Sequence, residues 1–169
     1  MPRVDAATAP DLWELSAEGV AAAVGHPLAA AGATVVSSPE LKSLQTTALM
    51  TGVGEDAVAA DPRFREVDRV ERVHDGFRAA RAAWVAGDFD DRHAGWETPD
   101  AAAQRFHEGI LAHPVEHLIV GTHGMALTAW MVAQGIIAPG HPAVAFWDAL
   151  GLPDVIEIDL PVLRVPDYR

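Results

Sequence analysis

Apolar and polar positions along the chain follow two periods, and the change between them is clearest at residues 118–134. This stretch begins with three consecutive apolar residues, as expected of a strand buried on both faces. A Gly-Thr-His-Gly segment containing His123 then interrupts it, and an apolar stretch of helical length follows. The pattern predicts a buried strand that delivers a histidine to the N-terminus of a helix.

Other parts of the chain show the same alternation of strand and helix patterns. Short β-branched or alternating runs predict strands at residues 34–37, 144–147 and 155–160. Capping residues followed by apolar positions at helical spacing predict helices at residues 17–25, 39–48, 77–87 and 99–110. Ser38 is expected to cap the second of these helices, with Pro39 at its first position. The alternation favours a three-layer α/β/α fold with a mostly parallel sheet.

Composition narrows the class of protein. The length of 169 residues suits one domain with a full hydrophobic core, residues 1–169. The net charge of -12 opposes binding to nucleic acid or to an anionic membrane, because both require a basic surface. The absence of cysteine excludes disulfides, thiol catalysis and cysteine-ligated zinc. No secretory signal is visible in the first 25 residues, so we expect a soluble cytoplasmic protein.

His123 is the first candidate for a functional residue. In an open parallel sheet, ligands bind beyond the carboxyl ends of the strands, and free amides at a helix start favour anions. Two other interpretations stay open: a hydrogen-bonded core histidine, and a membrane span over residues 118–137. Polar residues interrupt that stretch, whereas a span needs about 20 mostly apolar residues, so the span is disfavoured.

Three segments carry a resemblance to a known family. Residues 37–48 read Ser-Ser-Pro-Glu-Leu-Lys-Ser-Leu-Gln-Thr-Thr-Ala, residues 61–66 read Asp-Pro-Arg-Phe-Arg-Glu, and residues 122–124 read Thr-His-Gly. Together they resemble the histidine phosphatase superfamily, whose members share the phosphoglycerate mutase-like fold. The resemblance extends over residues 12–160 in the expected order.

The resemblance implies a reaction and a set of roles. A histidine nucleophile would take the phosphoryl group from a small phosphorylated substrate, and water would then release phosphate, with no metal or other cofactor. His123 would hydrogen-bond a phosphoryl oxygen beside the backbone of Gly124. Lys42 would supply the positive charge and Glu66 would be the general acid. Lysine is a point charge without the two-pronged geometry of arginine, so it would orient the phosphate less tightly.

Two of these assignments have simpler alternatives. Lys42 also suits an exposed surface position, where a lysine needs no functional explanation. Glu66 also suits a solvated carboxylate paired with Arg65 or Arg69. The sequence alone leaves these alternatives open.

The chain departs from the family in one essential motif. Family members carry Arg-His-Gly or Arg-His-Ala at the end of their first strand, which supplies the nucleophile, and no such pair precedes Leu15. The pair Arg92-His93 lies in an acidic loop that follows no strand. We therefore expect Met1 to be an internal methionine and the first strand to be missing, so that the 169-residue chain is inactive. In-frame codons upstream of Met1 that encode no apolar strand ending in Arg-His would contradict this expectation.

Other functions stay open for a chain that lacks the nucleophile. One is a non-catalytic pseudophosphatase that serves as an anion-binding or protein-interaction domain. An exposed sheet edge left by a missing strand favours pairing with another chain, so a homo-oligomer also stays open. Metal-dependent hydrolysis is disfavoured, because Pro114 separates His113 from His117 and no segment matches a zinc-binding pattern.

Overall fold

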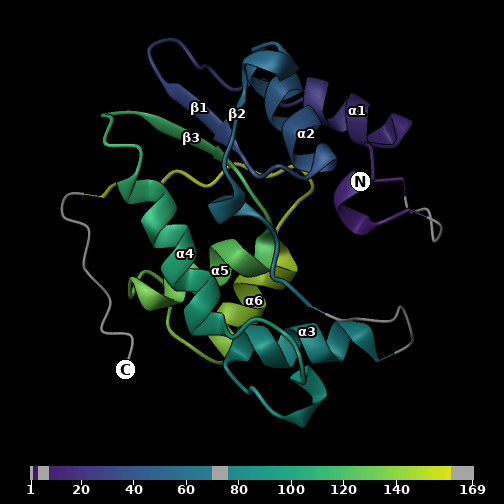
Figure 1. The fold of residues 1–169 in the computed structure, drawn as a ribbon, viewed down its shortest axis with the longest axis vertical. Helices are drawn as coiled ribbons and strands as arrows, with labels where there is room; N and C mark the ends of the chain where they lie inside the picture. Colours follow the sequence, from purple (N-terminus) through teal and green to yellow (C-terminus); the bar gives the residue numbers. More distant parts are fainter. Residues whose placement is uncertain (1, 4–7, 70–75, 161–169) are drawn as a thin grey trace. The chain divides into compact units, whose positions relative to one another are not determined.

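The computed structural model describes residues 2–3, 8–69 and 76–160, and Figure 1 traces the chain. Within these residues the protein contains six α-helices and a three-stranded parallel sheet, which confirms the α/β class. The chain divides into two compact units, and the single domain expected from the sequence stays a prediction. The first unit consists of Met1–Arg65, Gly109–His123 and Gly151–Val155, and the second of Glu66–Glu108, Gly124–Leu150 and Ile156–Arg169.

The first unit is built on the sheet, whose described strands lie in the order β2-β1-β3 (Figure 1). In both pairings the strands run parallel, and Ser37 lies opposite Ala60 on one side and Gly121 on the other. The carboxyl ends of the three strands therefore meet at one edge, and the loops that follow them start at the same level. The strand bounds are Thr34–Ser37 for β1, Ala59–Ala60 for β2 and Leu118–Gly121 for β3.

The strand predicted before His123 is present as β3, but its burial differs from the prediction. All four residues of β3 are half-buried, whereas the central strand β1 contains the fully buried Val36 and Ser37. The difference follows from position, because β3 lies at an edge of the described sheet and only β1 pairs with it there.

The first unit also contains two helices, α1 and α2. Helix α1 (Ala17–Val24) begins as predicted, with the Ser16 hydroxyl accepting a hydrogen bond from the Gly19 amide at 3.1 Å. Helix α2 (Leu41–Thr51) packs against α1 and β3 (Figure 1). Three short 3-10 turns also belong to this unit: η1 (Pro10–Leu12), η2 (Glu55–Ala57) and η3 (Pro62–Phe64).

The predicted start of α2 is wrong by two residues. The helix begins at Leu41 with Glu40 as its N-cap, not at Pro39 with Ser38 as its N-cap. The reason is that the Ser38 amide still donates to the Gly121 carbonyl at 2.8 Å, so the sheet holds the chain one residue beyond β1.

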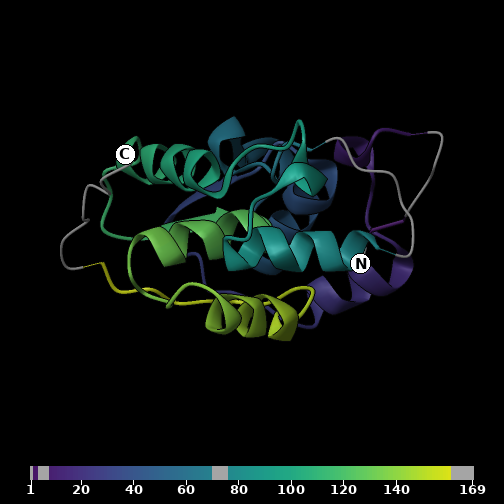
Figure 2. The same ribbon diagram turned by 90° about the horizontal axis from the view of Figure 1, so that it is seen from below.

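Helices form the second unit. Helices α3 (Phe77–Ala86), α5 (Gly124–Ala133) and α6 (His141–Ala149) pack against one another, as Figure 2 shows. The predicted helices at 77–87, 99–110 and 125–134 are thus confirmed as α3, α4 (Pro99–Leu111) and α5, and α4 extends into the first unit from Gly109. No helix of the described ranges has the length and apolar character needed to cross a membrane.

Two predicted strands are wrong. Residues 144–147 lie in α6, because Gly140 with its positive φ of 79° and Pro142 in the first turn start a helix there. Residues 155–160 form no strand. Alternation of side chains specifies an extended segment, but a strand also requires a neighbouring strand to pair with.

Gly121 allows α2 to approach β3 closely. A Cβ atom at this position would lie 2.0 Å from Thr47 Oγ1 and 2.6 Å from Ser37 Oγ. Both of these hydroxyls belong to buried side chains, so neither can move into solvent. The absence of a side chain at position 121 is therefore a packing requirement.

We expect Gly121→Ala to lower the free energy of unfolding by about 1–3 kcal/mol, because overpacking forces buried groups apart. Adding Thr47→Ala removes the nearest atom and should restore part of the loss. Gly54→Ala is the matched control, since Gly54 has a negative φ of -58° and open space where the methyl group of an alanine would lie. Urea unfolding measures all four proteins, and equal losses for the substitutions at 121 and 54 would contradict the packing requirement.

His107 on α4 is a buried histidine in the second unit. Its side chain is almost fully buried, and its Nδ1 lies 3.4 Å from Gln134 Nε2. Its Nε2 has no hydrogen-bond partner among the described residues. Burial lowers the pKa of His107 from its ordinary value of 6.5, although Glu108 acts in the opposite direction. The folded chain thus keeps this ring neutral where the unfolded chain would protonate it.

The lowered pKa makes the stability depend on pH with a definite sign. The contribution of His107 is fully present above pH 6.5 and is lost as the pH falls through 6.5 toward the folded pKa. We expect His107→Gln to flatten the fall in unfolding free energy between about pH 7.5 and about pH 5.5. The exposed His117 offers the same substitution as a control, and a His107→Gln protein that falls as steeply as the unmodified chain would refute the assignment.

Candidate functional site

The loops after β1 and β3 bring His123 against two oxygen-bearing side chains of the first unit. His123 Nε2 lies 2.8 Å from Ser38 Oγ and 3.2 Å from Glu40 Oε1. The His123 side chain is only 8% exposed. The structure therefore places His123 against Ser38 and Glu40 at the carboxyl edge of the sheet.

Glu40 connects His123 to Lys42. Its Oε1 faces His123, and its Oε2 forms an ion pair with Lys42 Nζ. The Glu40 side chain is 10% exposed and that of Lys42 is 20% exposed, so the pair is largely removed from water. Lys42 Nζ also donates to the Pro10 carbonyl oxygen at 2.9 Å. The alternative of a freely solvated surface lysine does not describe this side chain.

Sequence reasoning missed Glu40 as a site residue. An acidic residue at the start of a helix is usually explained by its favourable interaction with the helix dipole. Such a residue therefore does not by itself suggest a binding site. The available signal was its place directly after Ser37-Ser38-Pro39, two residues before Lys42.

The contacts of His123 argue against Ser38 as a nucleophile. In a serine–histidine–acid relay, the serine and the acid contact different ring nitrogens. Here Ser38 and Glu40 both contact Nε2. An ionised carboxylate can only accept, so with Glu40 ionised the proton lies on Nε2 and that nitrogen cannot activate the serine. The arrangement suits binding of an anion rather than attack by Ser38.

Buried hydroxyl groups hold the start of α2 against β1. Ser37 Oγ and Ser43 Oγ lie 2.9 Å apart, and Thr47 Oγ1 donates to the Ser43 carbonyl oxygen at 2.9 Å. The amide of Glu40 donates to Ser38 Oγ at 3.3 Å. These hydrogen bonds fix the backbone from which Glu40 and Lys42 extend.

The loop after β2 reaches the same edge of the sheet with Asp61. This carboxylate accepts hydrogen bonds from Arg63 Nε at 2.9 Å and Arg63 Nη2 at 2.7 Å, and it lies 3.0 Å from His113 Nε2. The hydrogen bonds from Arg63, and to a smaller extent the one from His113, hold the pKa of Asp61 far below its usual range. The Thr122 hydroxyl donates to the Phe64 carbonyl at 2.9 Å, which ties the loops after β2 and β3 together.

The two remaining predicted site residues, Glu66 and Gly124, belong to the second unit. Glu66 Oε1 accepts from the Val67 amide at 2.9 Å, and Glu66 Oε2 lies 4.0 Å from Arg69 Nη1. The pairing with Arg69 that the sequence left open is thus present. Gly124 is the first residue of α5, and a Cβ atom there would lie 3.2 Å from side-chain atoms of Leu150 and Trp147.

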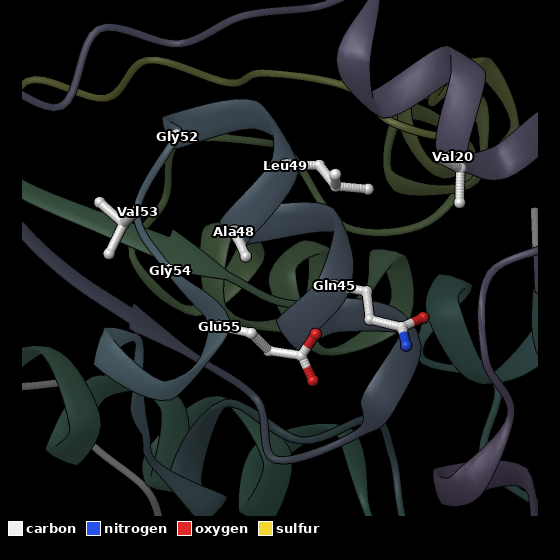
Figure 3. Close-up of a pocket in the computed structure, with 8 residues that line it drawn as sticks. All are labelled: Val20, Gln45, Ala48, Leu49, Gly52, Val53, Gly54 and Glu55. Atoms are coloured by element: carbon white, nitrogen blue, oxygen red, sulfur yellow. The ribbon is translucent and has the colours of Figure 1, made fainter.

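The first unit also contains a cavity of about 420 Å³. Figure 3 shows the residues that line it. Residues of α1, of α2 and of the following loop line it: Val20, Gln45, Ala48, Leu49, Gly52, Val53, Gly54 and Glu55. None of the predicted site residues is among them. The candidate anion site is therefore distinct from this cavity.

Solved structures provide the comparison with known proteins. Mycobacterial glucosyl-3-phosphoglycerate phosphatase in complex with VO3 shares 26% identity with this chain, over 82% of this chain and 75% of that one, with a TM-score of 0.53. The same phosphatase with inorganic phosphate shares 24% identity, over 82% and 75%, with a TM-score of 0.55. The protein TTHB049 from Thermus thermophilus shares 22% identity, over 76% and 75%, with a TM-score of 0.52. No family model and no curated protein matches the chain.

These similarities agree with the motifs at the sheet edge. The similar structures cover most of the chain and have the phosphoglycerate mutase-like arrangement of helices around a parallel sheet. The Ser-Ser-Pro segment follows β1 and the Thr-His-Gly segment follows β3, as the resemblance requires. The chain therefore has the phosphoglycerate mutase-like fold, and these structural neighbours are consistent with a member of the histidine phosphatase superfamily.

Proposed function

We propose that the chain is a histidine phosphatase-like phosphomonoesterase domain that binds the phosphoryl group of a small phosphorylated substrate. One observation carries the proposal: His123 and Lys42 converge on a single carboxylate at the carboxyl edge of the sheet. A position where two basic side chains already hold one anion is suited to holding another. The similarity to a phosphatase solved with inorganic phosphate and with VO3 supports the same ligand class.

Each predicted residue has a role in this proposal. His123 donates a hydrogen bond from Nε2 to a phosphoryl oxygen, and Lys42 neutralises the charge that builds on the transferring group. The backbone of Gly124, at the start of α5, contributes to anion binding at a helix N-terminus. Glu66 donates a proton to the leaving oxygen.

The proposed reaction also requires a histidine nucleophile, which forms phosphohistidine before water releases phosphate. The pair Arg92-His93 does not supply it: the His93 side chain is fully buried, and its Nε2 lies 2.8 Å from the Ala80 carbonyl oxygen. A histidine on a further strand, paired with β3 at the edge of the described sheet, would complete the proposed reaction.

The second candidate function is a pseudophosphatase that binds an anion or a protein without turnover. The observation in its favour is that Glu40 already occupies the space between His123 and Lys42. A domain that binds without catalysis also needs no nucleophile. The two candidates share the anion site and differ in the chemistry that follows.

Turnover separates the two candidates. We expect the 169-residue chain to hydrolyse p-nitrophenyl phosphate no faster than buffer, because phosphoryl transfer lacks its nucleophile. A longer chain that includes the in-frame residues upstream of Met1 should release phosphate with burst kinetics and form an acid-labile phosphohistidine. Mass spectrometry and a phosphate-release assay measure both. A folded longer chain without turnover would favour the pseudophosphatase.

His123→Ala tests the anion site itself. In the longer chain we expect kcat to fall by about 10²–10³-fold, the usual effect of losing one donor to the transition state. In the 169-residue chain we expect loss of inorganic phosphate binding, measured by isothermal titration calorimetry. The exposed His117→Ala is the matched control. Equal behaviour of the two alanine variants would remove His123 from the proposed site.

A further inference from the structure

Glu40 differs from the other carboxylates at the sheet edge in what it contacts. Asp61 pairs with Arg63 and His113, neither of which the proposed function uses. Glu40 instead contacts both of the basic side chains of the first unit that the proposed function assigns to the phosphoryl group. Its two oxygens are divided between them, Oε1 to His123 and Oε2 to Lys42.

The direction of the Glu40 side chain is informative. Glu40 is the N-cap residue of α2, with extended backbone angles of φ -67° and ψ 129°. A side chain at an N-cap commonly accepts from the free amides of the first turn. The Glu40 side chain makes no such capping hydrogen bond and extends toward His123 and Lys42. The Glu40 side chain therefore contacts the two basic side chains and does not cap the helix.

The negative charge of Glu40 opposes the binding of a second anion beside His123 and Lys42. A phosphate held by His123 and Lys42 would place its negative charge beside the Glu40 carboxylate, and like charges in a poorly solvated site repel strongly. The Glu40 side chain is 10% exposed, so water screens this repulsion only weakly. Phosphate binding thus requires the carboxylate to leave its two partners.

We propose that Glu40 is an internal anion that competes with the phosphoryl group for His123 and Lys42, so that it sets which phosphorylated ligands the site accepts. The inference rests on the proposed function, because it takes His123 and Lys42 as the phosphate-binding residues. Ligands with further contacts outside the phosphoryl group can displace the carboxylate, and free phosphate binds weakly. Glu40 is thereby a specificity-determining residue of the site.

Inorganic phosphate is the probe, titrated calorimetrically into the folded 169-residue chain and its Glu40→Gln variant. Glutamine keeps the size of the side chain and removes its charge, so we expect the dissociation constant for phosphate to fall by about tenfold or more. Glu55→Gln is the matched control, because Glu55 is an exposed glutamate of the same unit and the change in net charge is identical. It should alter the constant by less than about twofold.

A second variant guards against a folding defect. Glu40→Asp keeps the charge and shortens the side chain, so it cannot reach His123 and Lys42 together as Glu40 does. We expect it to bind phosphate more tightly than the unmodified chain and less tightly than Glu40→Gln. Circular dichroism identifies which variants are folded, and if Glu40→Gln unfolds, the Glu40→Asp titration decides.

The outcomes separate this inference from the proposed function. Tighter phosphate binding by Glu40→Gln that is abolished by adding His123→Ala supports both. Phosphate binding that is the same with and without the Glu40 carboxylate, yet is lost in His123→Ala, overturns the competition and leaves the proposed function standing. If no folded variant binds phosphate, both the competition and the proposed function are overturned.

Discussion

The parallel register of β1 with its two neighbours is the constraint on which the candidate site depends. Because Ser37 lies opposite both Ala60 and Gly121, three loops leave the sheet at the same level. The Ser38 amide extends the ladder by one hydrogen bond to the Gly121 carbonyl, and this contact sets where the chain turns toward α2. The turn then presents Glu40 to His123. The geometry of the site follows from strand pairing before any side chain is considered.

Buried hydroxyl groups help to fix the position of α2 against this edge. Ser37, Ser38, Ser43 and Thr47 are all buried, and their hydrogen bonds are made largely to one another and to nearby backbone. Such a network costs free energy if any member loses its partner, so it tolerates one arrangement only. Gly121 belongs to the same arrangement, because its missing side chain leaves room for the Thr47 and Ser37 hydroxyls. The need for glycine at position 121 and the contacts of His123 therefore depend on the same packing of α2 against the sheet.

The two four-residue strands β1 and β3 were predictable from the sequence, whereas β2 and the side-chain contacts at the site were not. An apolar run followed by Gly-Thr-His-Gly is enough to place His123 beyond a strand, since that conclusion depends only on period and breaks. The contact of Glu40 with His123 joins residues far apart in the chain and depends on how α2 starts, which shifted by two residues from the prediction. The false strand at 144–147 has a related cause, because a short apolar run carries no period long enough to separate strand from helix. Residues 155–160 have the alternation of a strand and lack the pairing.

The lysine at position 42 strengthens the competition that Glu40 imposes. A lysine ammonium group in a poorly hydrated place loses hydration, and the Glu40 carboxylate that it contacts offsets this cost. An ammonium group has three hydrogen-bond donors. Among the described residues, Lys42 uses two of them, one on Glu40 and one on the Pro10 carbonyl, and the third donor has no further partner there. An arginine would have five donors in a flat fork and could hold a carboxylate and a phosphate together. With lysine, only one donor is left for an incoming phosphoryl group, so that group gains less from Lys42 while Glu40 is in place than after the carboxylate has left.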